Sequence, residues 1–306
     1  MDIASRINEL KKRSNAIILA HYYQNAEIQD IADFIGDSFE LARKARDTGA
    51  STIVFCGVHF MAESAKILSP DKTVLLPAPD AGCPMADMAD EEAVRALRRQ
   101  HKDAAFVCYV NTSAAVKAEC DVCCTSSNAA LICSSVPQKE IVFLPDENLG
   151  DFVASRVKDK RFILYKGFCA THSRVTVDDF KRAREAMPDA EILVHPECRP
   201  EVVKLAGFAG STAQIINYIK QSPNKAFIIG TEQGILHQLK KQNPDKQFYI
   251  LSPKLICPNM KKTTLNDVLN SLEHPNQFEI NIDPQVMERA RKSLEKMLEL
   301  VRQNSK

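Results

Sequence analysis

The stretch Gly167-Phe168-Cys169-Ala170-Thr171-His172 places a cysteine near the middle of the 306-residue chain. Two more cysteines stand in loop-like surroundings, Cys83 in Ala-Gly-Cys-Pro and Cys257 in Leu-Ile-Cys-Pro. They lie 86 residues before and 88 residues after Cys169, so the three cysteines are almost evenly spaced. Even spacing over most of a chain is the first indication that one unit occurs three times.

Two further landmarks keep the same spacing from the cysteines. A polar residue ends the first expected strand of each repeat, 62, 60 and 62 residues before the cysteine; these residues are His21, Tyr109 and His195. A hydroxyl residue expected to cap a helix precedes the cysteine by 45, 43 and 45 residues; these residues are Ser38, Ser126 and Thr212. Agreement within two residues at three landmarks predicts a triplicated chain, although sequence identity between the repeats is weak.

Unbroken apolar runs, typical of parallel strands covered on both faces, alternate with segments typical of helices. Strands are expected over residues 16–20, 52–56, 73–77, 105–109, 121–124, 141–144, 161–165, 191–194, 226–229 and 247–251. Helices are expected over residues 4–13, 26–35, 39–45, 60–68, 90–100, 150–157, 177–187, 213–220, 233–241 and 284–301, and one more is expected to begin at 125–128.

This alternation predicts, for each repeat, a small parallel sheet with helices on both faces. Such sheets bind ligands beyond the carboxyl ends of their strands. We therefore predict an α/β fold of three pseudo-threefold-related repeats, each a small parallel sheet in a three-layer αβα sandwich, around a central cavity. A single eight-stranded α/β barrel is the alternative, but three repeats of about four strands do not divide into eight.

The repeats also predict the domain boundaries. The first, second and third repeats are expected over residues 1–84, 85–170 and 171–258. Residues 259–306 lie outside the repeat and form a predicted C-terminal helical tail. Its last part, Pro284 to Val301, is a charged amphipathic helix that we interpret as a strap on the surface.

Composition narrows the class of protein. Charged residues make up 26% of the chain and the net charge is +1, so no overall field would recruit nucleic acid or a membrane. The apolar runs are shorter than a membrane span, and no signal peptide is recognised before the first helix. We expect a cytoplasmic protein without nucleic-acid or membrane partners. Its ten cysteines then indicate metal binding or free thiols rather than disulfides.

We interpret Cys83, Cys169 and Cys257 as the protein ligands of one iron–sulfur cluster. A cubane cluster normally takes four thiolates, so three would leave one iron free to bind substrate as a Lewis acid. A single intracellular cysteine is more often a buried free thiol, but the shared repeat position favours the cluster for these three. A rival set, suited to zinc or to a redox pair, is Cys120, Cys123 and Cys124. The remaining cysteines are expected in the core; they are Cys56, Cys108, Cys133 and Cys198.

Polar side chains at the strand ends are candidates for proton transfer and for orienting a polar substrate. These residues are His21, Tyr23, Tyr109, Asn111, His195 and Glu197. An isolated polar residue at a strand end more often satisfies the backbone, but its recurrence in all three repeats favours a site. His172 follows Cys169 by three residues and is expected beside the cluster, within reach of its substrate.

The hydroxyl residues at the predicted helix starts form a third set of candidates; they are Ser38, Ser126, Ser211 and Thr212. A helix N-terminus binds anions through its free N–H groups and its dipole, so three of them could hold carboxylates or a phosphate. Ordinary capping accounts for each residue equally well. Neither a G-x-G-x-x-G nor a Walker A sequence is present, so nucleotide binding has no support.

Several motifs, in this order, resemble the quinolinate synthase family over about residues 16–264. They are His21-Tyr-Tyr23-Gln, Gly36-Asp-Ser38, Cys83-Pro-Met85, Tyr109-Val-Asn111, Thr125-Ser126, His195-Pro-Glu197, Gly210-Ser-Thr212, Gly230-Thr-Glu232 and Cys257-Pro-Asn-Met260-Lys-Lys. The resemblance implies three similar α/β domains and a condensing and dehydrating transferase of NAD biosynthesis. Its substrates would be iminoaspartate and dihydroxyacetone phosphate, and its products quinolinate, phosphate and water. It also implies a functional link to the aspartate-oxidising enzyme that supplies iminoaspartate.

The resemblance further implies a 4Fe–4S cluster on Cys83, Cys169 and Cys257, with one open iron. By motif match, Tyr23, His195 and Glu197 would transfer protons and His21 would orient the substrate. The remaining implied residues would hold carboxylates (Tyr109, Asn111, Ser38 and Ser126) or the phosphate (Ser211 and Thr212). The pair Cys120 and Cys123 departs from the family pattern, which leaves a redox role or accidental thiols open. Two other functions stay open as well, a cluster-free anion-binding protein and a zinc protein centred on that pair.

Overall fold

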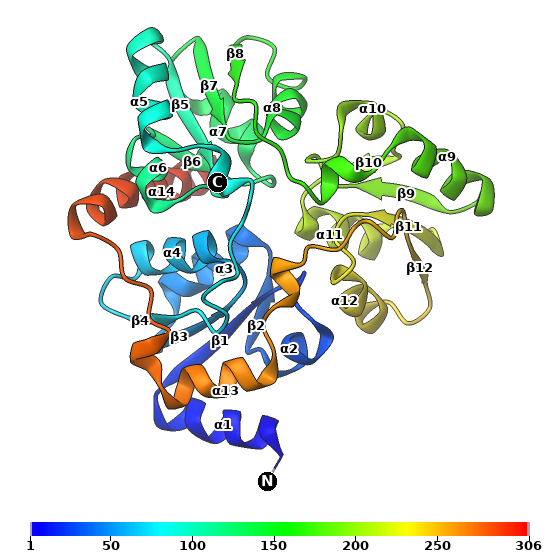
Figure 1. Ribbon diagram of the computed structural model, residues 1–306. Coiled ribbons are helices and arrows are strands. Elements are labelled where there is room, and N and C mark those ends of the chain that lie inside the picture. Colours follow the sequence, from blue (N-terminus) through cyan, green and yellow to red (C-terminus); the bar gives the residue numbers. More distant parts are fainter. Residues whose placement is uncertain (1, 305–306) are drawn as a thin grey trace.

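Three separate four-stranded sheets form the framework of the molecule, and all their strand pairs are parallel (Figure 1). This computed structural model describes residues 2–304; residues 1, 305 and 306 of the first and last predicted domains lie outside the described residues. Each sheet has the same order, in which its first strand lies between the second and the third. The triplicated α/β fold predicted from the sequence is therefore confirmed.

The strands of each sheet come from a single repeat. The first sheet contains β1 (Ala16–His21), β2 (Phe34–Gly36), β3 (Thr52–Cys56) and β4 (Thr73–Leu75). The second contains β5 (Ala105–Tyr109), β6 (Val122–Cys124), β7 (Glu140–Leu144) and β8 (Arg161–Leu164). The third contains β9 (Glu191–Val194), β10 (Phe208–Ala209), β11 (Ala226–Gly230) and β12 (Gln247–Ile250). Because the strands of a sheet all run in one direction, their carboxyl ends share one edge. The predicted boundaries between the domains stay a prediction.

Helices cover the faces of the sheets, and they include two short ones, over residues 114–118 and 200–203, that were not predicted. In the first repeat they are α1 (Ile3–Arg13), α2 (Ala26–Ile31), α3 (Ser38–Asp47) and α4 (His59–Leu68). In the second they are α5 (Glu91–Gln100), α6 (Ala114–Ala118), α7 (Ala129–Ser135) and α8 (Glu147–Ala154). In the third they are α9 (Val177–Ala186), α10 (Pro200–Val203), α11 (Thr212–Gln221) and α12 (Ile235–Gln242). Among residues 2–304, no helix combines the length and the apolar character needed to cross a bilayer.

Two short edge strands are absent from the prediction. The helix expected over residues 26–35 ends at Ile31, because Ala32 is extended and the Asp33 carboxylate accepts the Ile18 N–H at 2.8 Å. That bond turns the chain onto β1, where residues 34–36 pair as β2. Residues 208–209 pair with β9 in the same way as β10. Runs of two or three residues are too short for a periodic pattern to show them.

Three of the four predicted helix caps are wrong, since Ser38 and Ser126 do not cap a helix and Thr212 is already the first residue of α11. Asp37, not Ser38, caps α3, because its carboxylate accepts the N–H groups of both Phe39 and Glu40 at 3.0 Å. Ser126 does not cap α7, which begins only after Asn128. Ser211 does cap α11, and its hydroxyl accepts the Gln214 N–H at 3.2 Å. The idea of three hydroxyl-capped helix ends around one anion is therefore not supported.

The C-terminal segment is more than a strap on the surface. Its α13 (Leu265–Glu273) packs against α1, and its long α14 (Pro284–Asn304) packs against α6, β6 and α4 (Figure 1). On α14, the side chains of Ala290, Leu294 and Met297 are completely buried. Since α4 belongs to the first repeat and α6 to the second, α14 supplies core packing between these two repeats.

We expect Leu294→Ala to lower the free energy of unfolding by roughly 2–5 kcal/mol, because it removes a fully buried leucine side chain and leaves a cavity. Urea unfolding followed by circular dichroism measures the change. Glu288→Ala is the matched control on the same helix, where the side chain is 77% exposed, and it should stay within about 0.5 kcal/mol of wild type. Equal effects of the two substitutions would contradict the core role of α14.

Candidate active site

A cavity of about 360 Å³ lies where the carboxyl-terminal edges of the three sheets meet. Each repeat contributes residues at the carboxyl ends of its strands, such as His21 at the end of β1, Tyr109 at the end of β5 and His195 just after β9. Thirteen of the fourteen residues predicted for the site line this cavity: Cys83, Cys169, Cys257, His21, Tyr23, Ser38, Tyr109, Asn111, Ser126, His172, His195, Glu197 and Thr212. The exception is Ser211, whose hydroxyl is buried as the cap of α11 and also donates to Asp37 at 3.4 Å.

The three spaced cysteines face this common cavity in equivalent ways. Cys83, Cys169 and Cys257 are free thiols and are partly exposed, whereas the other seven cysteines are buried. A 3₁₀ turn follows each of the three, and the N–H group three residues beyond the cysteine points at its sulfur; these donors belong to Ala86, His172 and Met260. The three evenly spaced cysteines thus share one local geometry and line one cavity.

The three cysteine thiols are held in their protonated form. Burial raises the pKa of Cys83 to about 12, and the thiol of Cys257 raises it further. Burial also raises the pKa values of Cys169 and Cys257; the nearby Glu197 adds to this effect at Cys169. Ligation by these sulfurs would therefore displace protons, which is the usual behaviour of cysteine ligands in a metal site.

Beside Cys169, a thiol, an imidazole and a carboxylate come together. The His172 Nδ1 atom lies 3.2 Å from the Cys169 Sγ atom and 2.7 Å from the Glu197 Oε2 atom. The ligand atoms of these three residues lie within 4.8 Å of one another, so the group could hold a metal. His172 thus contacts the sulfur of Cys169, and its place beside a cluster stays a prediction.

Two histidines and a carboxylate have strongly shifted pKa values. Burial lowers the pKa of both His21 and His195 to about 3, so both imidazoles are neutral near pH 7. Burial acts to raise the pKa of Glu197, but His195 and His172 beside it bring that pKa down to about 2. Near pH 7 the cavity therefore contains the ionised Glu197 carboxylate beside the neutral His195 imidazole.

Tyrosine and amide groups complete the polar lining. The Tyr23 hydroxyl bonds to the Thr212 Oγ1 atom at 2.8 Å and to the Thr231 Oγ1 atom at 2.6 Å. Burial raises the pKa of Tyr23 and of Tyr109, and the charge of Glu197 raises both further. The Oδ1 atom of Asn111 is buried without a hydrogen-bond partner in the described part of the chain. An unpaired polar atom in a cavity wall is a candidate for binding substrate.

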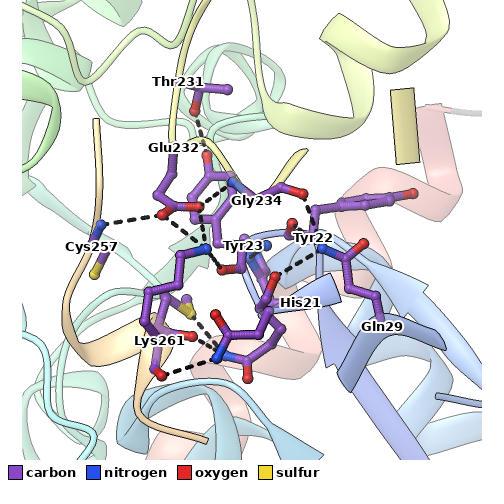
Figure 2. Close-up of polar contacts among 12 residues, drawn as sticks. His21, Tyr22, Tyr23, Gln29, Thr231, Glu232, Gly234, Cys257 and Lys261 are labelled. Carbon is purple, nitrogen blue, oxygen red and sulfur yellow. Dashed lines mark hydrogen bonds and ion pairs between the residues drawn. The ribbon is translucent and has the colours of Figure 1, made fainter. Parts of the chain in front are cut away.

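A buried ion pair beside Cys257 was not assigned a role from the sequence. The carboxylate of Glu232 is completely buried and lies 3.0 Å from the Lys261 Nζ atom, which also donates to the backbone carbonyl of Tyr23. Glu232 also accepts the Gly234 N–H at 2.7 Å and the Cys257 N–H at 3.3 Å. Figure 2 shows Lys261 between Glu232 and Tyr23. The sequence signals were the place of Glu232 three residues after the predicted strand 226–229 and its presence in the Gly230-Thr-Glu232 motif.

The rival cysteine set lies in the core rather than in a site. The Cys123 Sγ atom is 3.5 Å from the Cys108 Sγ atom and 3.3 Å from the Ser293 hydroxyl of α14. Burial raises the pKa of Cys123, which makes the thiol unreactive. Among residues 2–304, only Cys169, His172 and Glu197 form a group that could hold a metal ion with three such side chains. The zinc interpretation of Cys120 and Cys123 therefore has no structural support, and the core assignments of Cys56, Cys108, Cys133 and Cys198 are confirmed.

The fold and the cavity define a class of protein, a threefold-repeated α/β protein with a thiol-, imidazole- and carboxylate-lined site that could hold a metal. Comparison with known proteins gives the family. A family model described as Quinolinate synthetase A protein matches residues 5–299. This chain therefore belongs to the quinolinate synthase family, as the resemblance of its motifs implied.

Similar proteins are found in bacteria and in an archaeon. The chain is 59% identical to the quinolinate synthase of Caldicellulosiruptor saccharolyticus over 298 residues, which is 97% of this chain and 98% of that protein. It is 53% identical to the quinolinate synthase of Alkaliphilus metalliredigens over 299 residues, or 98% of both chains. It is 51% identical to quinolinate synthase 2 of Methanosarcina acetivorans over 296 residues, or 97% of this chain and 95% of that protein.

We expect Gly234→Ala to destabilise the protein by about 1–3 kcal/mol, because the new Cβ would lie 2.7 Å from backbone atoms of Tyr23. The free energy of unfolding in urea measures this loss. The control is Gly49→Ala, since a Cβ at Gly49 meets no atom within 4 Å, and that variant should be as stable as wild type or slightly more stable. A neutral Gly234→Ala variant would show that the loop around Tyr23 is not tightly packed.

Proposed function

We propose that this protein is a quinolinate synthase that condenses iminoaspartate with dihydroxyacetone phosphate and releases quinolinate, phosphate and water. One observation carries the proposal: three loops from three repeats bring one partly exposed cysteine each to a single cavity, beside the Cys169–His172–Glu197 group. Membership of the family supports it. An enzyme that oxidises aspartate would supply the reactive iminoaspartate.

The donor set fits a 4Fe–4S cluster held by Cys83, Cys169 and Cys257. All three are free thiols, and Fe–S clusters are bound by cysteine thiolates. When bound, such a cluster with three protein thiolates would supply one iron as a Lewis acid for a substrate oxygen or nitrogen. The N–H groups that point at the three sulfurs favour the thiolate form that ligation requires.

Proton transfer is assigned to the polar groups between the cysteines and the first and third sheets. Glu197 is ionised and is the assigned proton acceptor, while the hydrogen bond to His172 and the nearby His195 imidazole keep its carboxylate in place. The Tyr23 hydroxyl, fixed by two threonines, exchanges a proton with the substrate. The neutral His21 imidazole lies against the Tyr23 ring, with centroids 4.4 Å apart, and orients the substrate.

Substrate anions are assigned to the hydroxyl, amide and helix-end groups of the cavity wall. Tyr109, Asn111, Ser38 and Ser126 offer hydrogen bonds to carboxylates, and the buried Asn111 Oδ1 atom can accept one more bond from a substrate donor. Thr212 is the first residue of the ten-residue α11 and lines the cavity, so the N-terminus of this helix can hold the phosphate. Ser211 contributes from behind by capping that helix.

The protein purified without oxygen should contain about four irons and four sulfides per chain, and it should be brown. Cys83→Ser, Cys169→Ser and Cys257→Ser should each remove most of the iron and abolish quinolinate formation. Cys120→Ser is the matched control, because this thiol lies outside the cavity lining, and it should keep full iron and activity. Full iron content in all three ligand variants would refute the assignment of the cluster ligands.

Glu197→Gln should lower kcat for quinolinate formation by about 100-fold or more, because an amide cannot accept the proton that the carboxylate takes. The variant should keep the iron content of wild type. Product formation from enzymatically generated iminoaspartate and dihydroxyacetone phosphate provides the measurement. Unchanged kcat at full iron content would rule out Glu197 as the proton acceptor.

A further inference from the structure

One backbone hydrogen bond fixes each cysteine loop at the same place in all three repeats. In each sheet, a residue shortly after the third strand in chain order donates its N–H to the carbonyl two residues before the cysteine. In the first repeat, His59 donates to Ala81 at 2.8 Å. In the second and third repeats, Glu147 donates to Gly167 at 2.8 Å and Gln233 donates to Leu255 at 2.9 Å.

Two of the three repeats add a carboxylate to this contact. The residue just before the donor is Asp146 in the second repeat, and its Oδ2 atom accepts the N–H of Cys169 at 2.9 Å. In the third repeat it is Glu232, and its Oε1 atom accepts the N–H of Cys257 at 3.3 Å. In the first repeat Val58 stands at this place, and a valine side chain accepts no hydrogen bond.

Both carboxyl groups are completely buried and are anchored on their other side. The second oxygen of Asp146 accepts the Leu149 N–H at 2.7 Å, which caps α8. The second oxygen of Glu232 accepts the Gly234 N–H, and Lys261 offsets its charge (Figure 2). Burying an acid is costly unless every oxygen is hydrogen-bonded, so these two side chains act as rigid links from strand end to cysteine.

We propose that Asp146 and Glu232 are positioning residues that fix the backbone of Cys169 and Cys257 for the cluster, an inference that rests on the proposed function. Both cysteines lie in segments between a strand and a 3₁₀ turn, where regular structure does not hold the backbone. Groups that orient metal ligands typically contribute tenfold or more to metal retention. Cys83 differs, because no carboxylate among residues 2–304 accepts its N–H, and the chain before it is held by the His59 N–H and by Lys262 at Asp80.

The amide variants Asp146→Asn and Glu232→Gln test the inference. Each carboxyl group accepts two backbone N–H bonds, one on each oxygen, whereas an amide offers a single oxygen. One of the two bonds is therefore lost in either variant with almost no change in shape. Thermal unfolding checks that each variant is folded, and because two separate variants are made, a failure of one to fold leaves the other as the test.

The first measurement needs no iron. Hydrogen–deuterium exchange of the metal-free protein reports on the N–H groups of Cys169 and Cys257. In Asp146→Asn, peptides containing Cys169 should exchange about five- to tenfold faster than in wild type, and Glu232→Gln should do the same for Cys257. The peptide containing Cys83 should be unchanged in both.

The second measurement is the rate at which a ferrous chelator removes iron from the reconstituted protein. Both variants should lose iron about tenfold faster than wild type. The matched control is Asp121→Asn, because this carboxylate also accepts a backbone N–H, that of Phe106 at 2.7 Å, but at the opposite edge of the second sheet. Its rate of iron loss should equal that of wild type.

The outcomes distinguish a failure of the positioning role from a failure of the proposed function. Unchanged exchange at both cysteines, or wild-type iron loss in both folded variants, would overturn the positioning role. Faster iron loss in Asp121→Asn as well would also overturn it, because the effect would then be general. If the wild-type protein takes up no iron, the proposed function fails and the role in cluster retention fails with it. The exchange data would still report whether the carboxylates hold the loops.

Discussion

The repeats share a site only while the edges of their sheets stay together, and buried hydrogen bonds to Tyr23 join the first repeat to the third. Its hydroxyl bonds Thr212 and Thr231, and Thr231 in turn bonds the Nε2 atom of His172 at 2.9 Å. Lys261 holds the carbonyl of the same tyrosine. Inside a cavity wall such bonds do not compete with water, so they are stronger than on a surface. A shift of one sheet against the other would break several of them at once.

This closed arrangement also determines the electrostatics. Burial favours the neutral forms of His21, His195 and the cysteine thiols, and it would do the same to Glu197 without the two neighbouring imidazoles. The partners of each group therefore decide its charge, since the Glu197 carboxylate beside two histidines stays ionised whereas His21, His195 and the thiols stay neutral. Ligand thiols that start protonated have to lose their protons as metal binds, so folding of the cavity and assembly of a metal centre are linked.

Sequence patterns predicted the fold because each apolar run is local and the three cysteines are evenly spaced. Both features can be read from the sequence without knowing which residues meet in space. They failed where a contact comes from another part of the chain. Residues 34–36 and 208–209 become strands only by pairing with β1 and β9. Asp37 was passed over as a cap because both Asp and Ser suit that position, and only the two bonds to Phe39 and Glu40 decide between them. The contact between Asp146 and Cys169 leaves no local pattern in the sequence, because the two residues lie 23 positions apart.

The repeats have stayed alike where they bind the proposed cluster and have diverged where they face the substrate, and chemistry explains this division. Three corners of a cubane are equivalent, so one loop design with the same backbone bond and the same N–H to sulfur suits all three cysteines. The substrates are asymmetric, so the strand ends that would meet them carry different groups, such as His21, Tyr109 and His195. The carboxylates Asp146 and Glu232 lie between these two regions. The first repeat has no such carboxylate. The repeats therefore differ both where they would meet the substrate and in how they hold the backbone of the cysteine ligands.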